Sequence, residues 1–180
     1  MDKSHLFYQT RARRPMLDRA EGIYLWDKNG KRYIDGSSGA MVSNIGHSNP
    51  RVLDAMRAQM DKSTFGYRLH FETQPAEDLA NRVAGLSPSG HEKVFFVSGG
   101  SEAVESAIKI ARQYRYVIGD DKRSKLISRS PSYHGSTMGA LSLTSYRPLT
   151  DPFNPLLIDS PKIPAPRCYL DAEDLSDDER

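Results

Sequence analysis

The segment best suited to chemistry is a short glycine-rich turn, Ser98-Gly99-Gly100-Ser101, between an apolar run and a helical pattern. Glycine lets a backbone turn sharply and lets a ligand approach closely. The first amides of a helix lack internal partners, and the helix dipole places roughly half a positive charge there. Gly100 and Ser101 can donate backbone amides, and the Ser101 hydroxyl can cap the helix or bond an anion. The turn is therefore predicted to bind a phosphate group.

Two better-known phosphate motifs are missing from this turn. The residues after Gly100 are Ser-Glu-Ala-Val, which excludes Gly-x-x-x-x-Gly-Lys-Ser/Thr, and Gly99 and Gly100 are adjacent without a third glycine, which excludes Gly-x-Gly-x-x-Gly. Glu102, in the first helical turn, opposes a bound phosphate unless its side chain points away. A small phosphate site is favoured over a nucleotide site, and a tight connection that binds nothing is the simplest alternative.

A second group of residues, Tyr133, His134 and Gly135, follows the next predicted strand. An aromatic side chain at the carboxyl end of a strand can stack on a planar ring, and open α/β sheets bind ligands at that edge. Taken singly, the simpler interpretations are a core or rim tyrosine and a hydrogen-bonded structural histidine. No metal site is predicted, because the histidines lack the spacing of metal ligands (His5, His47, His70, His91, His134).

An alternation of strands and helices must position these two groups. The apolar run 94–97 is short and does not alternate with polar residues, which predicts a buried strand of a parallel sheet. The next strand is predicted at residues 125–128. A helix with an apolar stripe is predicted after Ser101 (Val104, Ala107, Ile108, Ala111). This order is typical of an α/β fold. A short helical or extended piece is expected up to about Thr144, and six prolines after Arg147 predict extended surface chain.

The first part of the chain predicts smaller elements. Residues 1–20 are polar and predict an arm or a short helix packed on a partner. Residues 23–27 and 31–35 flank Asn29-Gly30, which predicts a hairpin, and the Gly- and Ser-rich stretch 36–47 predicts a loop. Two amphipathic helices are then expected, one from Pro50 to about residue 61 and one from about residue 73 to Pro88.

Composition narrows the function classes. Hydrophobic residues make up 38% and charged residues 27% of the chain, as in ordinary globular proteins. The formal charge of +2 comes without a basic block, so no nucleic-acid partner is predicted. Cys168 is the single cysteine, which excludes an internal disulfide and favours a reducing, cytoplasmic setting. No apolar run approaches the roughly 18 residues of a membrane helix, so no membrane association is expected.

Four segments, in this order, resemble the class-III pyridoxal-phosphate-dependent aminotransferases: GIYLWDKNGKRYIDGSSG, NIGHSNPRV, SGGSEAVESAIKIARQY and SYHGSTMGALSLT. The resemblance runs from about Ala20 to about Arg167. It implies an α/β architecture of fold type I. Residues 1–61 are then expected to be an N-terminal small-domain segment, and residues 62–180 to begin the mostly parallel-sheet large domain that binds the cofactor.

The resemblance also implies roles for individual residues. Gly100 and Ser101 match the positions that hold the phosphate of pyridoxal 5'-phosphate. Tyr133 matches the aromatic residue that stacks on the pyridine ring, and His134 and Gly135 complete that motif. The family usually has Ser-Gly-Ser or Ser-Gly-Thr at the turn, so Gly99 removes one hydroxyl. The implied activity moves an amino group from an amine or amino-acid donor to an oxo-acid acceptor, and the resemblance also implies a homodimer.

No catalytic residue is assigned within these 180 residues. The family's Schiff-base lysine lies beyond the Tyr-His-Gly motif, and none of the lysines here has a matching context (Lys3, Lys28, Lys31, Lys62, Lys93, Lys109, Lys122, Lys125, Lys162). Ser176 and Glu179 form a capping box at the very end, and only two or three strands are predicted where about five or six are usual. We therefore expect the N-terminal portion of a longer enzyme. An aminomutase or decarboxylase on the same scaffold, and a non-catalytic phosphate-binding or interaction module, remain as alternatives.

Overall fold

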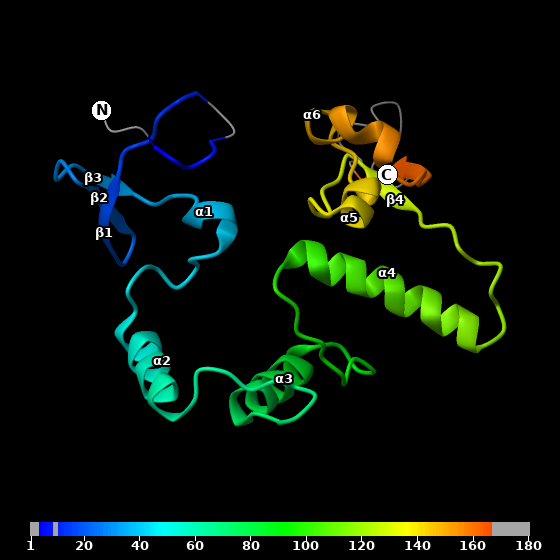
Figure 1. The fold of residues 1–180 in the computed structure, drawn as a ribbon, viewed down its shortest axis with the longest axis horizontal. Coiled ribbons are helices and arrows are strands. Elements are labelled where there is room, and N and C mark those ends of the chain that lie inside the picture. Colours follow the sequence, from blue (N-terminus) through cyan, green and yellow to red (C-terminus); the bar gives the residue numbers. More distant parts are fainter. Residues whose placement is uncertain (1–3, 9–10, 167–180) are drawn as a thin grey trace, which may run out of the picture. The chain divides into compact units, whose positions relative to one another are not determined.

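The structure, a computed structural model, describes residues 4–8 and 11–166 (Figure 1). The chain divides into two compact units, Met1–Leu79 and Ala80–Arg180, with the boundary inside helix α3 (Gln74–Leu86). The predicted capping box at Ser176 and Glu179 lies outside the described residues, as does Cys168. Within the described ranges, no helix is both long and apolar enough to cross a membrane.

A three-stranded antiparallel sheet forms the start of the first unit. The predicted hairpin is confirmed: β2 (Tyr24–Asp27) pairs with β3 (Arg32–Ile34). The Asp27 carboxylate holds the turn, accepting hydrogen bonds from the backbone N–H groups of Asn29 at 2.9 Å and Lys31 at 3.0 Å. The prediction of an arm or helix for residues 1–20 is wrong at its end, where β1 (Leu17–Glu21) pairs with β2.

The polar sequence of β1 explains why the pattern missed it. Its side chains are mostly exposed, so no apolar alternation is needed. Backbone hydrogen bonds to β2 hold β1 in its strand conformation. A cation–π contact adds to them, because the Arg19 guanidinium lies 3.6 Å from the centre of the Trp26 ring.

The glycine- and serine-rich stretch after the hairpin contains one distorted turn of helix, α1 (Ser38–Met41), within the predicted loop. Its conformation is unusual, because Ser38 and Met41 both have positive φ angles, 55° and 61°. The predicted helix that follows is confirmed as α2 (Pro50–Lys62), with proline in its first turn. The next predicted helix is confirmed as α3.

The second unit is built around α4 (Gly100–Val117), which begins directly at the predicted glycine turn. The predicted strand at 94–97 is wrong, since the described chain has no strand there and Phe96 is 42% exposed. A short apolar run becomes a strand only where a neighbouring strand supplies the hydrogen-bond ladder. The next predicted strand exists but lies further along, as β4 (Ser128–Ser130), in parallel with β5 (Lys162–Pro164).

Helical turns occupy the chain between β4 and β5. The piece expected to be helical or extended up to about Thr144 is a helix, α5 (Met138–Leu143). The extended chain expected after Arg147 is wrong as far as Leu156, because α6 (Arg147–Thr150) and the 3-10 helix η1 (Asp151–Leu156) lie there. Prolines sit in the first turn of both helices, where a missing N–H costs no hydrogen bond.

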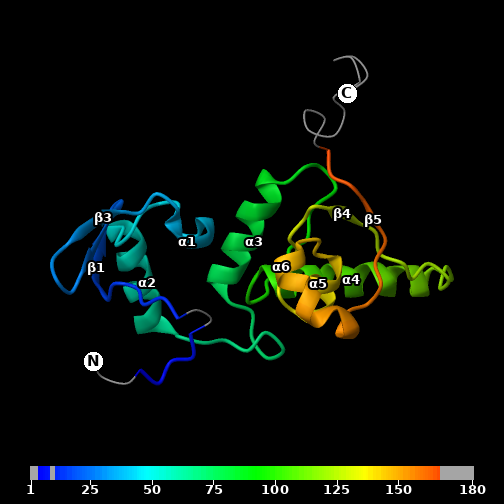
Figure 2. The same ribbon diagram turned by 90° about the horizontal axis from the view of Figure 1, so that it is seen from above.

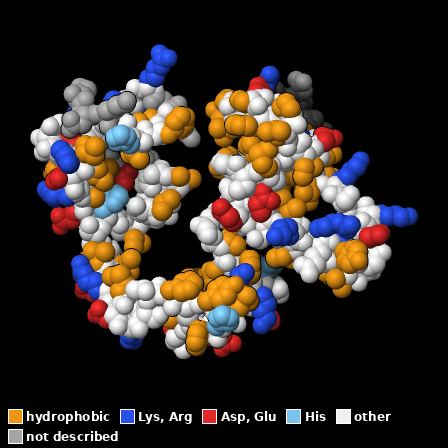
Figure 3. All heavy atoms as spheres, viewed as in Figure 1, with side chains coloured by type: hydrophobic (Ala, Val, Ile, Leu, Met, Phe, Trp, Pro, Cys, Tyr) orange, Lys and Arg blue, Asp and Glu red, His pale blue; other side chains and the backbone are white. Residues whose placement is uncertain are grey.

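The small core of the second unit lies at α5. Ala140 and Leu141 are its buried hydrophobic residues among those described, at 0% and 6% exposure. Helix α5 packs against the beginning of α4, as both ribbon views show (Figure 1, Figure 2). Many other apolar side chains are exposed, and Figure 3 shows them gathered over the part of this unit that carries α6 and η1.

Candidate functional site

The beginning of α4 is an open helix N-terminus. Gly99 precedes it in extended conformation, no side chain caps it, and the first turn is closed by Ala103 N donating to Gly99 O at 3.0 Å. The backbone N–H groups before Ala103 point out of the helix. A Cβ built at Gly100 would meet nothing within 4 Å, so the space beside this residue is free. An anion can reach these amides.

The segment that carries the second predicted group lies directly against this helix start. The backbone N–H of Ser136 donates to Ser101 Oγ at 3.0 Å. Gly135 has a φ of 141°, and a Cβ on it would lie 2.6 Å from Ser101 Oγ. Both the backbone angle and the space therefore require glycine here. The structure thus brings Ser101 and Gly135, from the two sequence-predicted groups, into contact.

The Tyr133 ring is available for a ligand. The side chain is 62% exposed, and its hydroxyl oxygen lies 3.1 Å from Ser136 Oγ. Ser136 in turn donates its backbone N–H to Ser101. A chain of two hydrogen bonds therefore connects the exposed ring to the start of α4.

The backbone of His134 is hydrogen-bonded, but one of its ring nitrogens has no hydrogen-bond partner among the described residues. Its N–H donates to Oγ1 of the buried Thr144 at 3.0 Å. Its Nε2 is buried and has no hydrogen-bond partner among the described residues. The backbone of His134 is thus anchored, whereas its buried Nε2 can accept a partner from outside the described residues.

Sequence reasoning missed Glu105, which is central to the packing of the site. One of its oxygens, Oε1, accepts three hydrogen bonds: from Thr137 Oγ1 at 2.7 Å, Gly139 N at 2.9 Å and Ala140 N at 3.1 Å. The hydrogen bond from Thr137, followed by those from the two amides, lowers the pKa of Glu105. No sequence pattern marked it, because Glu105 lies beside the predicted apolar stripe and not in it.

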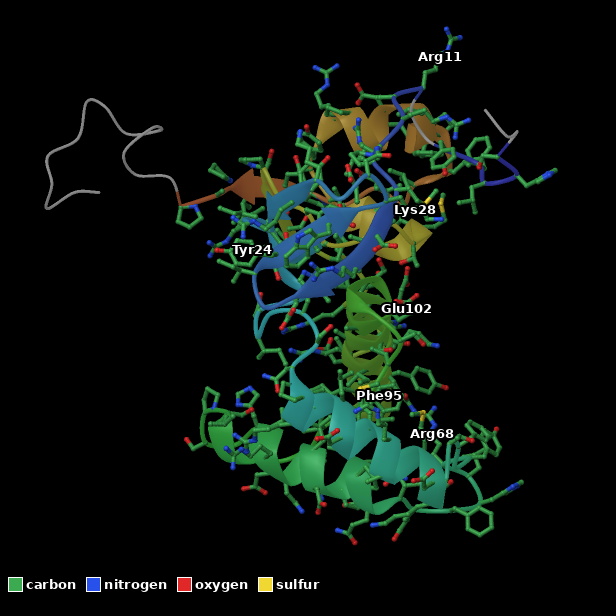
Figure 4. All side chains as sticks on the ribbon, turned by 90° about the vertical axis from the view of Figure 1, so that its left-hand side faces the viewer. Arg11, Tyr24, Lys28, Arg68, Phe95 and Glu102 are labelled. Atoms are coloured by element: carbon green, nitrogen blue, oxygen red, sulfur yellow. The ribbon has the colours of Figure 1, made fainter. Side chains whose placement is uncertain are left out.

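Glu102 places a negative charge beside the glycine turn. Glu102 lies on α4 (Figure 4). Its Oε2 is 3.0 Å from the position that a Cβ on Gly99 would take. The side chain is exposed, so it can rotate away without loss of packing. The described part of the chain has no group of acidic, histidine or cysteine side chains that could hold a metal ion.

A separate polar cluster lies in the first unit, after β3. Asp35 accepts a hydrogen bond from the Ser38 N–H at 2.8 Å, and its other oxygen lies 2.7 Å from His47 Nε2. The hydrogen bond from His47 is the largest cause of the lowered pKa of Asp35. These contacts hold the ends of the segment that contains the strained Ser38.

The sequence profile of the class-III aminotransferases matches residues 8–179. The chain belongs to this family. It is 43% identical over 155 residues to the uncharacterized aminotransferase YodT of Bacillus subtilis, a match that covers 86% of this chain and 35% of that protein. It is 37% identical over 162 residues to adenosylmethionine-8-amino-7-oxononanoate aminotransferase of Nitratidesulfovibrio vulgaris, covering 89% of this chain and 30% of that protein.

Solved transaminase structures confirm the fold type of this class-III aminotransferase chain. An (S)-enantioselective omega-transaminase from Thermomicrobium roseum superposes with a TM-score of 0.88 at 37% identity, covering 98% of this chain and 40% of that one. An omega transaminase from Pseudomonas jessenii in complex with PMP gives a TM-score of 0.86 at 30% identity, covering 94% and 39%. The match with this chain spans 35% and 30% of the length of the two curated relatives named above.

Membership of the class-III aminotransferases confirms the predicted cofactor, pyridoxal 5'-phosphate. Its phosphate needs amides or hydroxyls, and its ring needs a flat neighbour. The described residues offer both within one small region, at the start of α4 and at Tyr133.

Proposed function

We propose that this chain supplies part of the cofactor site of an enzyme that moves an amino group from an amine or amino-acid donor to an oxo-acid acceptor. The observation that carries the proposal is the contact of Ser101 with Gly135 and Ser136. This contact places an uncapped helix N-terminus and an exposed aromatic ring on adjoining segments.

In this proposal the phosphate of the cofactor binds at the beginning of α4. Gly100 and Ser101 donate their backbone N–H groups, which the helix leaves unpaired. Ser101 Oγ already accepts a hydrogen bond from Ser136, so its own hydrogen is free to be donated to a phosphate oxygen. The open space at Gly100 fits a close approach by the phosphate.

Tyr133 supplies the flat surface for the pyridine ring, and the two residues after it set its position. His134 is anchored through its backbone to Thr144, and Gly135 packs on Ser101. When bound, the cofactor acts as an electron sink for the carbanion formed at the donor carbon. The residues described here bind and orient it.

We propose no catalytic residue among residues 1–180, and assign the cofactor-bonding lysine to further chain. The support is that the sequence covers only 30% to 39% of the length of its curated relatives. In the same proposal, residues 1–61 form a small-domain segment and residues 62–180 the start of the large domain.

The amino donor and oxo acid are proposed to be small molecules, handled by a cytoplasmic homodimer. The relatives' names specify adenosylmethionine in one case and acetylornithine in another, so the relatives support amino-group transfer in general. Exposed apolar side chains on α2 support a covering surface from a partner or from further chain (Val52, Met56 and Met60, at 41%, 55% and 55%).

The test uses the full-length protein, titrated with pyridoxal 5'-phosphate and followed by visible absorption and circular dichroism. The loaded protein is then given amino acids and terminal amines, each with an oxo acid, and amino-group transfer is measured by chromatography. A cofactor signal with transfer supports the proposal. Release of carbon dioxide or migration of the amino group identifies a decarboxylase or an aminomutase, and the absence of any cofactor signal identifies a non-catalytic module.

A further inference from the structure

The start of α4 touches the segment after Tyr133 at two levels. Ser101 contacts Gly135, and four residues later on both segments Glu105 contacts Gly139. Residues four apart on a helix lie on one face, one turn above the other. The two contacts therefore form a ladder along α4, and a segment held at two points cannot pivot about either one.

We infer that Glu105 is a positioning residue for the cofactor, which holds the loop of Tyr133 against the phosphate-binding turn on α4. The inference rests on the proposed function, and extends it to a side chain that does not touch the cofactor. Its connection to the ring is short, because only three residues separate Tyr133 from Thr137, to which Glu105 is hydrogen-bonded.

The hydrogen bonds of Glu105 fix both the end of the loop and the beginning of α5. Thr137 is the residue before α5, and Gly139 and Ala140 contribute amides from its first turn. No side chain of α5 itself caps this turn. The Glu105 carboxylate, from α4, therefore caps the N-terminus of α5. The same hydrogen bonds connect α5 to α4.

The space around Glu105 is matched to its carboxylate. A Cβ on Gly139 would lie 2.7 Å from Oε1 and 2.9 Å from Cδ of Glu105, closer than side chains pack. Gly139 has ordinary helical backbone angles, so its lack of a side chain serves this contact and no special conformation. The hydrogen bonds also favour the ionised carboxylate, which accepts them more strongly than a neutral acid does.

The test compares the full-length holoenzyme with Glu105→Ala and Glu105→Gln, at temperatures well below unfolding. The visible circular dichroism per bound cofactor reports ring orientation, and kcat is measured at saturating pyridoxal 5'-phosphate. For Glu105→Ala we expect at least about a twofold fall in the dichroic signal and about a tenfold to hundredfold fall in kcat, since small misplacements of reacting groups are costly. Glu105→Gln keeps an acceptor oxygen and should restore most of the dichroic signal. Glu77→Ala, an exposed glutamate on α3, is the matched control and should change neither.

Gly139→Ala provides an independent arm, because its methyl group displaces the Glu105 carboxylate without removing it. It should lower the dichroic signal in the wild-type background and have a smaller effect in Glu105→Ala. If Glu105→Ala does not fold, Gly139→Ala decides the question. Wild-type dichroism and kcat in Gly139→Ala, or in a folded Glu105→Ala, overturn the inference while the proposed function stands. Failure of the wild-type protein to bind pyridoxal 5'-phosphate overturns both.

Discussion

Ser101 and Gly135 approach so closely that a Cβ on Gly135 would lie 2.6 Å from Ser101 Oγ and 2.9 Å from Ser101 Cα. A serine at a helix start and a glycine in a distant loop are thereby fitted to each other. The glycine turn before α4 and the segment after Tyr133 are consequently packed together, so a substitution in either segment should affect both.

Gly135→Ala should weaken cofactor binding as well as stability. The φ of 141° strains any side chain, and the new methyl group would also collide with Ser101. Gly119→Ala is the matched control, because φ there is 77° but a Cβ would meet nothing within 4 Å. We expect about 1 kcal/mol of destabilisation at Gly119 and clearly more at Gly135 in urea unfolding. Equal effects of the two substitutions would contradict the close contact.

Ser101→Ala should reduce the affinity for pyridoxal 5'-phosphate. The hydroxyl accepts from Ser136 N and is free to donate to a phosphate oxygen, so the substitution removes two hydrogen bonds. A loss of about 1.5 to 3 kcal/mol, or roughly tenfold to hundredfold in Kd, is expected for bonds to a charged group. Fluorescence titration measures it. Ser106→Ala, at the other serine of α4, should leave Kd unchanged, and a similar loss there would point to a general weakening of the helix.

Two substitutions of Tyr133 should distinguish the contribution of its ring to cofactor binding from that of its hydroxyl. Tyr133→Phe removes only the contact with Ser136 Oγ, so we expect at most about a fivefold weaker Kd, from one lost hydrogen bond of about 1 kcal/mol. Tyr133→Ala removes the stacking surface, and the visible dichroism of the bound cofactor should change strongly. Equal dichroic spectra for the two variants would show that the ring of Tyr133 does not lie against the cofactor.

Glu102→Gln should strengthen phosphate binding. Its carboxylate lies beside Gly99, and like charges repel even where solvent weakens the interaction. Because the side chain is exposed, we expect about a twofold to fivefold lower Kd for pyridoxal 5'-phosphate at low salt, shrinking at high salt. Glu92→Gln, at an exposed residue before the turn, serves as the control. An increase in Kd for Glu102→Gln would mean that the carboxylate has a positive role at the turn.

The pair of Asp35 and His47 should make stability depend on pH. Because its folded pKa is lowered, Asp35 stabilises the fold fully above its unfolded pKa of about 3.9, and the contribution is lost as pH falls through the lower folded value. Asp35→Asn should therefore lower the urea midpoint at pH 7, and its difference from wild type should shrink below about pH 4. Asp54→Asn, in the exposed ion pair with Arg57, should change the midpoint little at either pH.

Local signals were sufficient for part of this structure. Asn29-Gly30 predicted the hairpin, and the glycine turn predicted the start of α4 to within two residues, because both features depend on adjacent residues. Strand pairing decided the rest. The strand β1 is polar and forms by pairing with the neighbouring β2, whereas the apolar run at 94–97 forms no strand in the described chain.

The candidate site shows the same division. Gly100, Ser101 and Tyr133 could be proposed from the sequence because their residue types suit a phosphate and a ring. Glu105 could not, since its three hydrogen bonds come from residues more than thirty positions away. A glutamate on a predicted helix is usually a solvated side chain. Only the docking of α5 makes it a connection between segments.

The parallel pair of β4 and β5 has a consequence for handling this protein. Within the part of the chain that the structure describes, these two strands pair only with each other, so each has an outer edge with unpaired N–H and C=O groups. Such edges can pair with further strands. In a longer chain, further strands can add to the sheet at these edges. In a preparation of these residues alone, they favour strand exchange between molecules and aggregation.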